Sequence, residues 1–253
     1  MKEWAADTVQ ISFARDSSAD IARSDNVWVA NIVDRYIEHC QMSENPRNRK
    51  ASYHHGNLRQ AVLDLALTTL AQSSAHELSV RNLATQLGVS DSAVYRHFVN
   101  KDALLLALVV EGFRRLTEAQ VDAFAAGIAR GASARDAFRA GGLAYVKFAR
   151  AHAELFRLMF GGFTDPQQDN GELARARREN SDVTAEAIRR MIGPLADDAQ
   201  LRTYSVGVRS FVHGFAMLWI DGHLDGDETD IEALAESALA FSMDALPAVE
   251  RRG

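Results

Sequence analysis

The sequence predicts an all-α protein, and two observations carry that prediction. The 253 residues are rich in Ala, Leu and Arg and include only 4 prolines, a composition that favours helices. After residue 57, apolar residues recur at spacings of three and four, whereas no stretch of useful length alternates as a half-buried strand does. The 47% hydrophobic content suffices for a sizeable core in one large domain or two smaller ones.

The front of the chain differs from the rest. The stretch "ARDSSADIARSDN" is polar and aperiodic, so we expect residues 1–41 to be a disordered extension or a wrongly assigned start, with Met42 as the true one. An extra docking helix in "VWVANIVDRYIEHC" is the alternative. We therefore expect an extension over residues 1–45 and two helical domains, residues 46–101 and 102–248.

The first domain begins with a helix from about residue 57, with one apolar face formed by Leu58, Val62, Leu65 and Thr69. Ser79 is suited to cap a short helix whose inward residues are Val80, Leu83, Ala84 and Leu87. Gly88 ends that helix, because glycine adopts the left-handed conformation at little cost. Ser90 is suited to cap the next short helix, which turns Val94 and Phe98 inward.

The second domain is predicted to be a series of helices. Asn100 is suited to cap a long helix over residues 101–126, which we expect to end at Gly127. A helix over 134–150 has an expected weak point at Gly141 and Gly142, and a short apolar helix is expected over 151–160. A loop over 161–171 and a charged helix over 172–192 follow, ending at Gly193 and Pro194.

The last two predicted helices are the most apolar. Over residues 200–222 one stripe is formed by Leu201, Tyr204, Val208, Phe211, Phe215 and Leu218. The other side also carries Val206, Val212, Met217, Trp219 and Ile220, so we expect burial on more than one side. The final helix, over 230–247, places on one face Leu234, Ala238, Phe241 and Ala245.

Two short helices joined by a tight glycine turn are the helix-turn-helix pattern, and Ala84, Gly88 and Val94 fit its spacing. Residues 46–101 carry seven Lys or Arg against three Asp or Glu in a chain of net charge −6. A basic module on an acidic body suits a polyanion such as DNA, although a solvated charged face remains the plain alternative. The candidate DNA-binding residues are Arg47, Arg49, Lys50, Ser79, Arg81, Ser90, Asp91, Ser92, Ala93, Tyr95, Arg96, His97 and Lys101.

Within this set, we expect residues 90–97 to form a recognition helix in the major groove. Its short side chains, Ser92 and Ala93 among them, would allow a close approach to base edges. Tyr95 and Lys101 are residue types that hold phosphates. The basic arm at residues 47–50 could reach along or into the minor groove.

The stretches "YHHGNLR", "LSVRNLATQLGVS" and "AVYRHFVNKDALL" resemble the DNA-binding domain of the TetR (tetracycline repressor-like) family over about residues 46–110. The resemblance implies an all-α homodimer with a three-helix DNA-binding head and a helical body that binds a small effector. "HAELFRLMF" is similar to one branch of the family, which also has a Trp-His-Gly sequence. Here Val212 stands where that branch usually has Trp, before His213 and Gly214.

On this resemblance we expect a ligand-responsive regulator, a repressor released by a small, largely apolar effector. The aromatic residues of the body are mostly core, but some are expected to line a pocket, with His213 as a polar anchor or else a satisfied core histidine. The candidates are Phe113, Tyr145, Phe148, Phe156, Phe160, His213 and Trp219. The helices over 200–222 and 230–247 are the expected dimer interface, through Phe211, Phe215, Leu218, Leu234, Ala238 and Phe241.

Other classes of protein fit less well. No glycine-rich phosphate loop, G-x-S-x-G elbow or H-E-x-x-H motif is present, so an enzyme of unknown type is the weaker alternative. A non-sequence-specific architectural DNA-binding protein is the other alternative, but we would expect it to be basic overall. We expect no cofactor and no metal, since the adjacent His54 and His55 have no Cys or carboxylate cluster nearby. The single Cys40, short apolar runs and lack of a signal peptide predict a cytoplasmic protein without a membrane span.

Overall fold

The structure is a computed structural model that describes residues 58–162, 171–192 and 197–244. The chain divides into two units, residues 1–44 and 45–253. The expected extension, Met42 and the alternative docking helix therefore lie outside the described residues. The described part contains helices and no strand, which confirms the all-α prediction.

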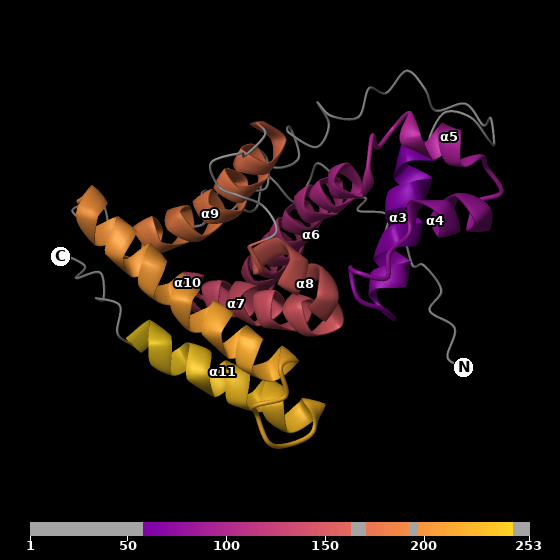
Figure 1. Ribbon diagram of the computed structural model, residues 1–253. Coiled ribbons are helices and arrows are strands. Elements are labelled where there is room, and N and C mark those ends of the chain that lie inside the picture. Colours follow the sequence, from indigo (N-terminus) through magenta and orange to yellow (C-terminus); the bar gives the residue numbers. More distant parts are fainter. Residues whose placement is uncertain (1–57, 163–170, 193–196, 245–253) are drawn as a thin grey trace, which may run out of the picture. The chain divides into compact units, whose positions relative to one another are not determined.

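Within the described ranges, the head contains three helices and the body six; their arrangement is seen in Figure 1. Those of the head are α3 (Leu58–Leu70), α4 (Val80–Gln86) and α5 (Asp91–Tyr95). Those of the body are α6 (Lys101–Ala129), α7 (Ala134–Ala151), α8 (Ala153–Phe160), α9 (Gly171–Ile192), α10 (Asp198–Ile220) and α11 (Glu228–Asp244).

The predicted caps of the head are confirmed. The hydroxyls of Ser79 and Ser90 accept from the backbone N–H groups of Asn82 and Ala93, at the starts of α4 and α5. Asn100 caps α6 in the same way, with its side-chain oxygen 2.8 Å from the nitrogen of Ala103. Each cap satisfies an N–H group that has no partner within its own helix.

The predicted apolar face of α3 was wrong by a small rotation. The buried residues are Val62, Leu63, Ala66 and Leu70, and only Val62 belongs to the predicted face. Leu58 and Leu65 are partly buried beside this core, and the Thr69 hydroxyl donates to the Leu65 carbonyl. The helix is apolar on most sides, so spacing alone did not select the face that meets α4 and α6.

Glycines in the body do not break helices where they were expected to. Helix α6 continues through Gly127 to Ala129, and the chain turns at Gly131, whose φ is 78°. A Cβ at Gly127 would lie 3.2 Å from the backbone of Ala137 on α7. Helix α7 likewise runs unbroken through Gly141 and Gly142. These glycines permit close helix contacts rather than ending helices.

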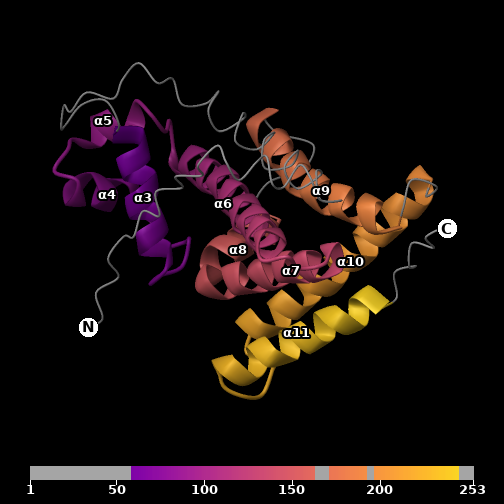
Figure 2. The same cartoon turned by 180° about the vertical axis from the view of Figure 1, so that it is seen from behind.

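Helix α7 lies at the centre of the body. It packs against α6, α10 and α11, while α9 packs on α6 and α10 (Figures 1 and 2). Helix α6 also contacts α3, so it belongs to both head and body. One apolar core runs from Val62 on α3 through Leu108 on α6 to Leu239 on α11. Helix α6 therefore connects the packing of the body with that of the head.

Helices α10 and α11 each bury one side and expose apolar residues on another. Those buried on α10 include Val212, Ala216 and Trp219, so the side of Val212 and Trp219 is the inward one. In the predicted stripe Leu201 is buried, whereas the other members are partly buried or exposed. Leu218 is the most exposed of them, at 46% of its surface. On α11 the buried residues are Ile231, Ala235, Leu239 and Met243, whereas Phe241 is 75% exposed.

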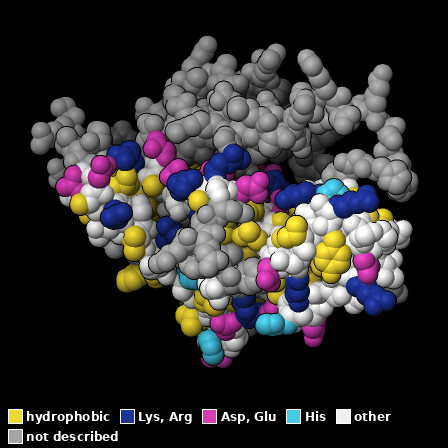
Figure 3. Space-filling view, turned by 45° about the horizontal axis from the view of Figure 1, so that its top comes forward, with side chains coloured by type: hydrophobic (Ala, Val, Ile, Leu, Met, Phe, Trp, Pro, Cys, Tyr) yellow, Lys and Arg dark blue, Asp and Glu magenta, His cyan; other side chains and the backbone are white. Residues whose placement is uncertain are grey.

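Basic and acidic side chains both occur across the face seen in Figure 3. Several ion pairs join residues of one helix, as Arg114 and Glu118 do on α6, where both side chains are exposed. Such exposed pairs contribute little to stability individually. None of the helices in the described ranges is long and apolar enough to cross a membrane.

Candidate nucleic-acid interface and ligand pocket

The turn between α4 and α5 has the geometry that the sequence predicted. Gly88 has a φ of 67°, in the left-handed region, and its N–H donates to the carbonyl of Thr85. Val89 donates to the carbonyl of Ala84, which closes the end of α4. Val94 is fully buried and fixes α5 against the head core. The turn and this anchor together set the direction of α5.

The remaining side chains of α5 and its flanks face outward. Ser90, Asp91, Ser92, Tyr95, Arg96 and His97 are exposed, and Ala93 is partly buried. The helix itself is shorter than the predicted 90–97, because Arg96 is its C-cap and His97 lies in the turn that follows. The hydroxyls of Ser90 and Ser92 lie 3.0 Å apart, so the cap is itself part of the exposed surface.

The predicted cations differ in how they are held. Arg81 has an 84% exposed side chain and lies 4.0 Å from Asp91, a distance that leaves it nearly unconstrained. The Lys101 ammonium donates to the carbonyl of His76 at 2.7 Å. An ammonium has three donors, so this bond fixes Lys101 without exhausting it. Ser79 is partly buried as the cap of α4, and Arg47, Arg49 and Lys50 lie outside the described residues.

The body contains two adjoining hollows. The wide hollow has a volume of about 310 Å³ and is lined by Phe113, Met159, Phe160, Gly162, Arg177, Asn180, Ser181 and Arg209. The narrow hollow, of about 30 Å³, lies among α6, α7, α9, α10 and α11 and has room for about one water molecule. Phe160, Asn180 and Arg209 line both. The wide hollow alone has the volume of a small-ligand site.

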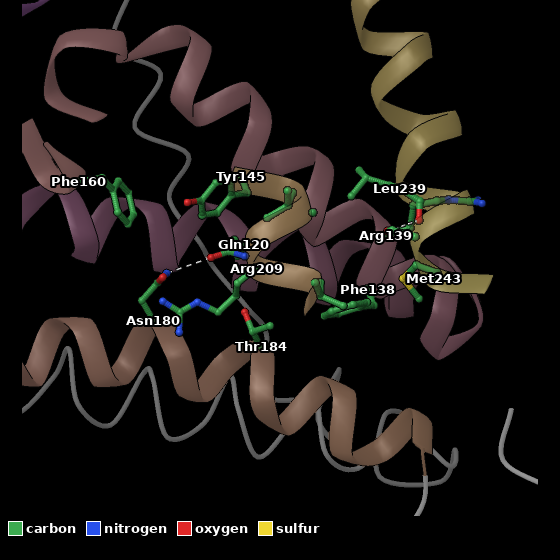
Figure 4. A pocket seen from close by; sticks show the side chains of 14 residues that line it. Gln120, Phe138, Arg139, Tyr145, Phe160, Asn180, Thr184, Arg209, Leu239 and Met243 are labelled. Carbon is green, nitrogen blue, oxygen red and sulfur yellow. Dashed lines mark hydrogen bonds between the residues drawn. The ribbon is translucent and has the colours of Figure 1, made fainter. Parts of the chain in front are cut away.

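A buried polar cluster forms the wall between α6 and α9. The Asn180 Nδ2 donates to Thr117 Oγ1 at 3.1 Å and to Gln120 Oε1 at 3.0 Å. Gln120 and Thr184 are 6% and 7% exposed and line the narrow hollow, as Figure 4 shows. Buried polar groups of this kind need partners, so they fix the two helices relative to each other.

Arg209 reaches from α10 toward Asn180 on α9 (Figure 4). Its positive charge lies close enough to His213 to contribute, after burial, to lowering the pKa of that imidazole. Burial raises the pKa of the Tyr145 hydroxyl, and Arg209 opposes that rise. Arg209 has no carboxylate partner in the described part of the chain.

His213 lies behind the pocket wall. Its Nδ1 is 3.0 Å from the Tyr145 hydroxyl, and its ring stacks on Phe156 with 5.4 Å between centroids. Because burial lowers the pKa of His213, the neutral ring is favoured, and its Nδ1 can accept a hydrogen bond from the Tyr145 hydroxyl. This arrangement fits the interpretation as a satisfied core histidine.

The predicted pocket residues separate into two groups. Tyr145 lines the narrow hollow, Phe113 lines the wide hollow and Phe160 lines both. The others are in the core or behind the wall and line neither hollow: Phe148, Phe156, His213 and Trp219. The stripe of aromatics at helical spacing did not distinguish wall from core.

Sequence reasoning missed the polar lining residues Gln120, Asn180 and Arg209, and also Thr117, which lines neither hollow but accepts a hydrogen bond from Asn180. One signal was that Thr117 and Gln120, three apart, interrupt the apolar face of α6. Asn180 lies among other polar residues of α9, where nothing in the spacing marks it, whereas Arg209 is a cation between Val208 and Ser210 in the largely apolar α10. In the described ranges no group of His, Cys, Asp and Glu is placed to hold a metal ion.

The head and body are also joined by charge. Arg115 on α6 lies 3.3 Å from Asp64 on α3 and donates to Glu111 at 2.7 Å. Burial raises the pKa of Glu111, but hydrogen bonds from Arg114 and Arg115 outweigh burial and lower it overall. Glu111 is therefore held as a carboxylate that orients Arg115 toward the head.

The capped helix-turn-helix and the helical body define a helix-turn-helix transcriptional regulator. Residues 62–108 match the model of a family described as "Bacterial regulatory proteins, tetR family". Residues 138–241 match one described as "Tetracyclin repressor-like, C-terminal domain". The chain belongs to the TetR family of transcriptional regulators.

Similar proteins agree with this assignment. A solved structure of a protein of unknown function from Rhodococcus sp. RHA1 is 34% identical, covers 78% of this chain and 99% of its own, and has a TM-score of 0.64. The TetR-family regulator PfmR from Thermus thermophilus shares the fold at 20% identity, covering 75% of this chain and 99% of its own with a TM-score of 0.51. The class D tetracycline repressor protein of Escherichia coli is 43% identical over 53 residues, which are 21% of this chain and 24% of that protein. The chain thus matches only about a quarter of that curated relative.

Proposed function

We propose that the chain is a ligand-responsive transcriptional repressor that binds a palindromic operator as a homodimer. The observation that carries the proposal is the head, where Gly88 and the buried Val94 orient a short helix with an exposed polar surface. A helix held in this way can enter the major groove of B-DNA. Membership of the TetR family supports this use of the head.

Contacts with DNA divide into two kinds in this proposal. Ser92 and Ala93, near the start of α5, would approach base edges and set sequence preference. Arg81, Tyr95 and Lys101 would contact phosphates and set orientation. Lys101 is held by the His76 carbonyl, so its contact would be more rigid than that of the freely exposed Arg81.

The exposed apolar surface of α10 and α11 supports a dimer. Val206, Leu218, Leu234 and Phe241 are exposed by 46–75%. Side chains of this size grouped on neighbouring helices mark an interaction surface. A two-fold pairing through them would place two α5 helices about one DNA turn apart, roughly 34–36 Å.

An effector in the wide hollow would control the spacing of the heads. The hollow lies against α6, and α6 shares its core and the Arg115–Asp64 pair with the head. A ligand that binds more tightly to a state with altered α6 shifts the population toward that state. The walls formed by Phe113, Met159 and Phe160 indicate a small, largely apolar ligand. A regulator of this kind would act where DNA is, in the cytoplasm, without enzymatic activity.

Selection from a random duplex library tests the proposal. The full chain should enrich an inverted repeat with half-sites centred about one helical turn apart. Retention without sequence enrichment would instead indicate an architectural DNA-binding protein, and no retention would rule out a DNA-binding role.

Variants of the head separate the two kinds of contact. Tyr95→Ala should weaken binding to matched and mismatched sites alike and reduce the salt dependence. Ser92→Ala should alter the selected sequence instead. Unchanged affinity of Tyr95→Ala in gel-shift titrations would show that Tyr95 does not contact the phosphates.

A further inference from the structure

We propose that the wide hollow binds a compact organic monocarboxylate, with its carboxylate at Arg209 and its apolar part against Phe113, Met159 and Phe160. The proposal rests on the proposed function in one respect, that this ligand is the effector. It adds the charge of the ligand and the residue that recognises it.

The charge of the lining residues favours an anionic ligand. Arg139, Arg177 and Arg209 line the two hollows, and no Asp or Glu is among their described lining residues. Arg139 is paired with Asp136 at 2.9 Å, and the Arg177 guanidinium lies 5.8 Å from the ring centre of Phe113. Arg209 has no such carboxylate partner in the described ranges. A cation on the wall of a hollow without a nearby carboxylate attracts an anionic ligand.

The hydrogen-bond donors of the wide hollow also favour a carboxylate. Asn180, which lies beside Arg209 in Figure 4, uses its Nδ2 for Thr117 and Gln120. The Ser181 hydroxyl donates to the carbonyl of Arg177. The forked guanidinium of Arg209 therefore remains a strong donor on the wall of the wide hollow, and it matches one carboxylate in a bidentate pair.

The apolar wall of the wide hollow matches the apolar part of such a ligand. Phe113 and Phe160 meet edge to face, with ring centres 5.3 Å apart, and Met159 is 2% exposed beside them. The volume of about 310 Å³ is ample for a ligand of about ten non-hydrogen atoms. Benzoate and octanoate are of this size, and each has a neutral amide of nearly the same shape.

Calorimetric titration of the full chain without DNA tests the site. The probes are benzoate and octanoate, with benzamide, octanamide and inorganic phosphate for comparison. At least one carboxylate should bind ten-fold or more tightly than its amide and than phosphate. Arg209→Gln should remove that preference, because only the charge of the ligand distinguishes the pair.

Arg202→Gln is the matched control. Arg202 is also exposed on α10 but lines neither hollow, so its removal should leave carboxylate binding unchanged. The proposal is overturned by an amide or phosphate that binds as tightly as the carboxylate, by an unchanged Arg209→Gln, by an equal loss in Arg202→Gln, or by no binding of either carboxylate.

A second titration separates this proposal from the function. The bound carboxylate should lower the affinity of the chain for its selected duplex. If the carboxylate binds but does not change the affinity for DNA, the binding site is supported and its role as effector site is wrong. If the chain binds DNA but no carboxylate, the function as a regulator is supported and the carboxylate site is wrong.

Discussion

Gly88 in the head and Gly141 in the body are both essential to the packing described above, but for different reasons. Gly88 has a φ of 67°, and a Cβ added there would meet nothing within 4 Å. Gly141 is in the middle of α7, and its Cβ would collide with the ring of Phe124 on α6. The first glycine is needed for its backbone conformation and the second for the space it leaves.

The difference teaches which parts of the molecule local sequence specifies. In the head, the caps Ser79, Ser90 and Asn100 and the turn at Gly88 involve partners within a few residues. In the body, α7 is placed by contacts with residues far along the chain, such as Leu239, which a Cβ on Gly142 would approach to 2.9 Å.

The largest effect is expected at the outer surface of the body. Phe241→Glu would place a charge on the exposed apolar stripe of α11, where the proposed dimer would bury it. Separated heads lose the advantage of linked binding, so affinity for the selected duplex should fall on the order of 10²–10⁴-fold. Light scattering measures the oligomeric state, and fluorescence anisotropy measures the affinity for the duplex. Ala233→Glu, exposed elsewhere on α11, should change neither; a dimeric Phe241→Glu that binds normally would place the interface elsewhere.

Gly141→Ala tests the space-limited glycine. The added methyl must displace Phe124, whose ring stacks on Phe138 at 5.9 Å, and such overpacking costs about 1–3 kcal/mol of unfolding free energy. Gly207→Ala, in α10 with nothing within 4 Å, should instead gain up to about 1 kcal/mol from helix propensity. Denaturant unfolding measures both. A stabilised Gly141→Ala would contradict the close contact of α6 and α7.

Gly88→Ala tests the conformation-limited glycine. An alanine in the left-handed region costs about 1–2 kcal/mol, although no atom is displaced. Gly88→Asn should cost less, since asparagine tolerates that region better. If thermal unfolding shows equal losses for the two variants, backbone strain is not their cause.

The smallest effect is expected in the pH dependence of stability. Burial lowers the pKa of His213 in the folded chain, so below the ordinary histidine value of about 6.5 the unfolded chain binds more protons. Stability should therefore fall as pH falls from 7 toward 5. His213→Asn, which cannot be protonated there, should reduce that slope while keeping an acceptor for Tyr145. An unchanged slope would mean that other groups cause the pH dependence. His152 is one such group, because burial also lowers its pKa.

The same contrast explains what could be predicted from the sequence. The caps, the turn and the inward Val94 and Phe98 were predicted because each depends on neighbours in sequence. The buried face of α3 and the unbroken α6 and α7 were missed because they depend on which helix lies opposite. The pocket was predicted as aromatic, with His213 as its one possible polar anchor. Its polar wall arises because Asn180 on α9 meets Thr117 and Gln120 on α6, about 60 residues earlier, and helical spacing contains no such information.

The central claim is that two heads of this kind, held by one dimeric body, read the two halves of one site. Anisotropy titrations at a single salt concentration test it with three labelled duplexes: the selected inverted repeat, the same duplex with one half-site scrambled, and an unrelated sequence. We predict that scrambling one half weakens binding on the order of 100-fold or more, and that the unrelated sequence binds more weakly still. Equal affinity for all three duplexes would contradict the account.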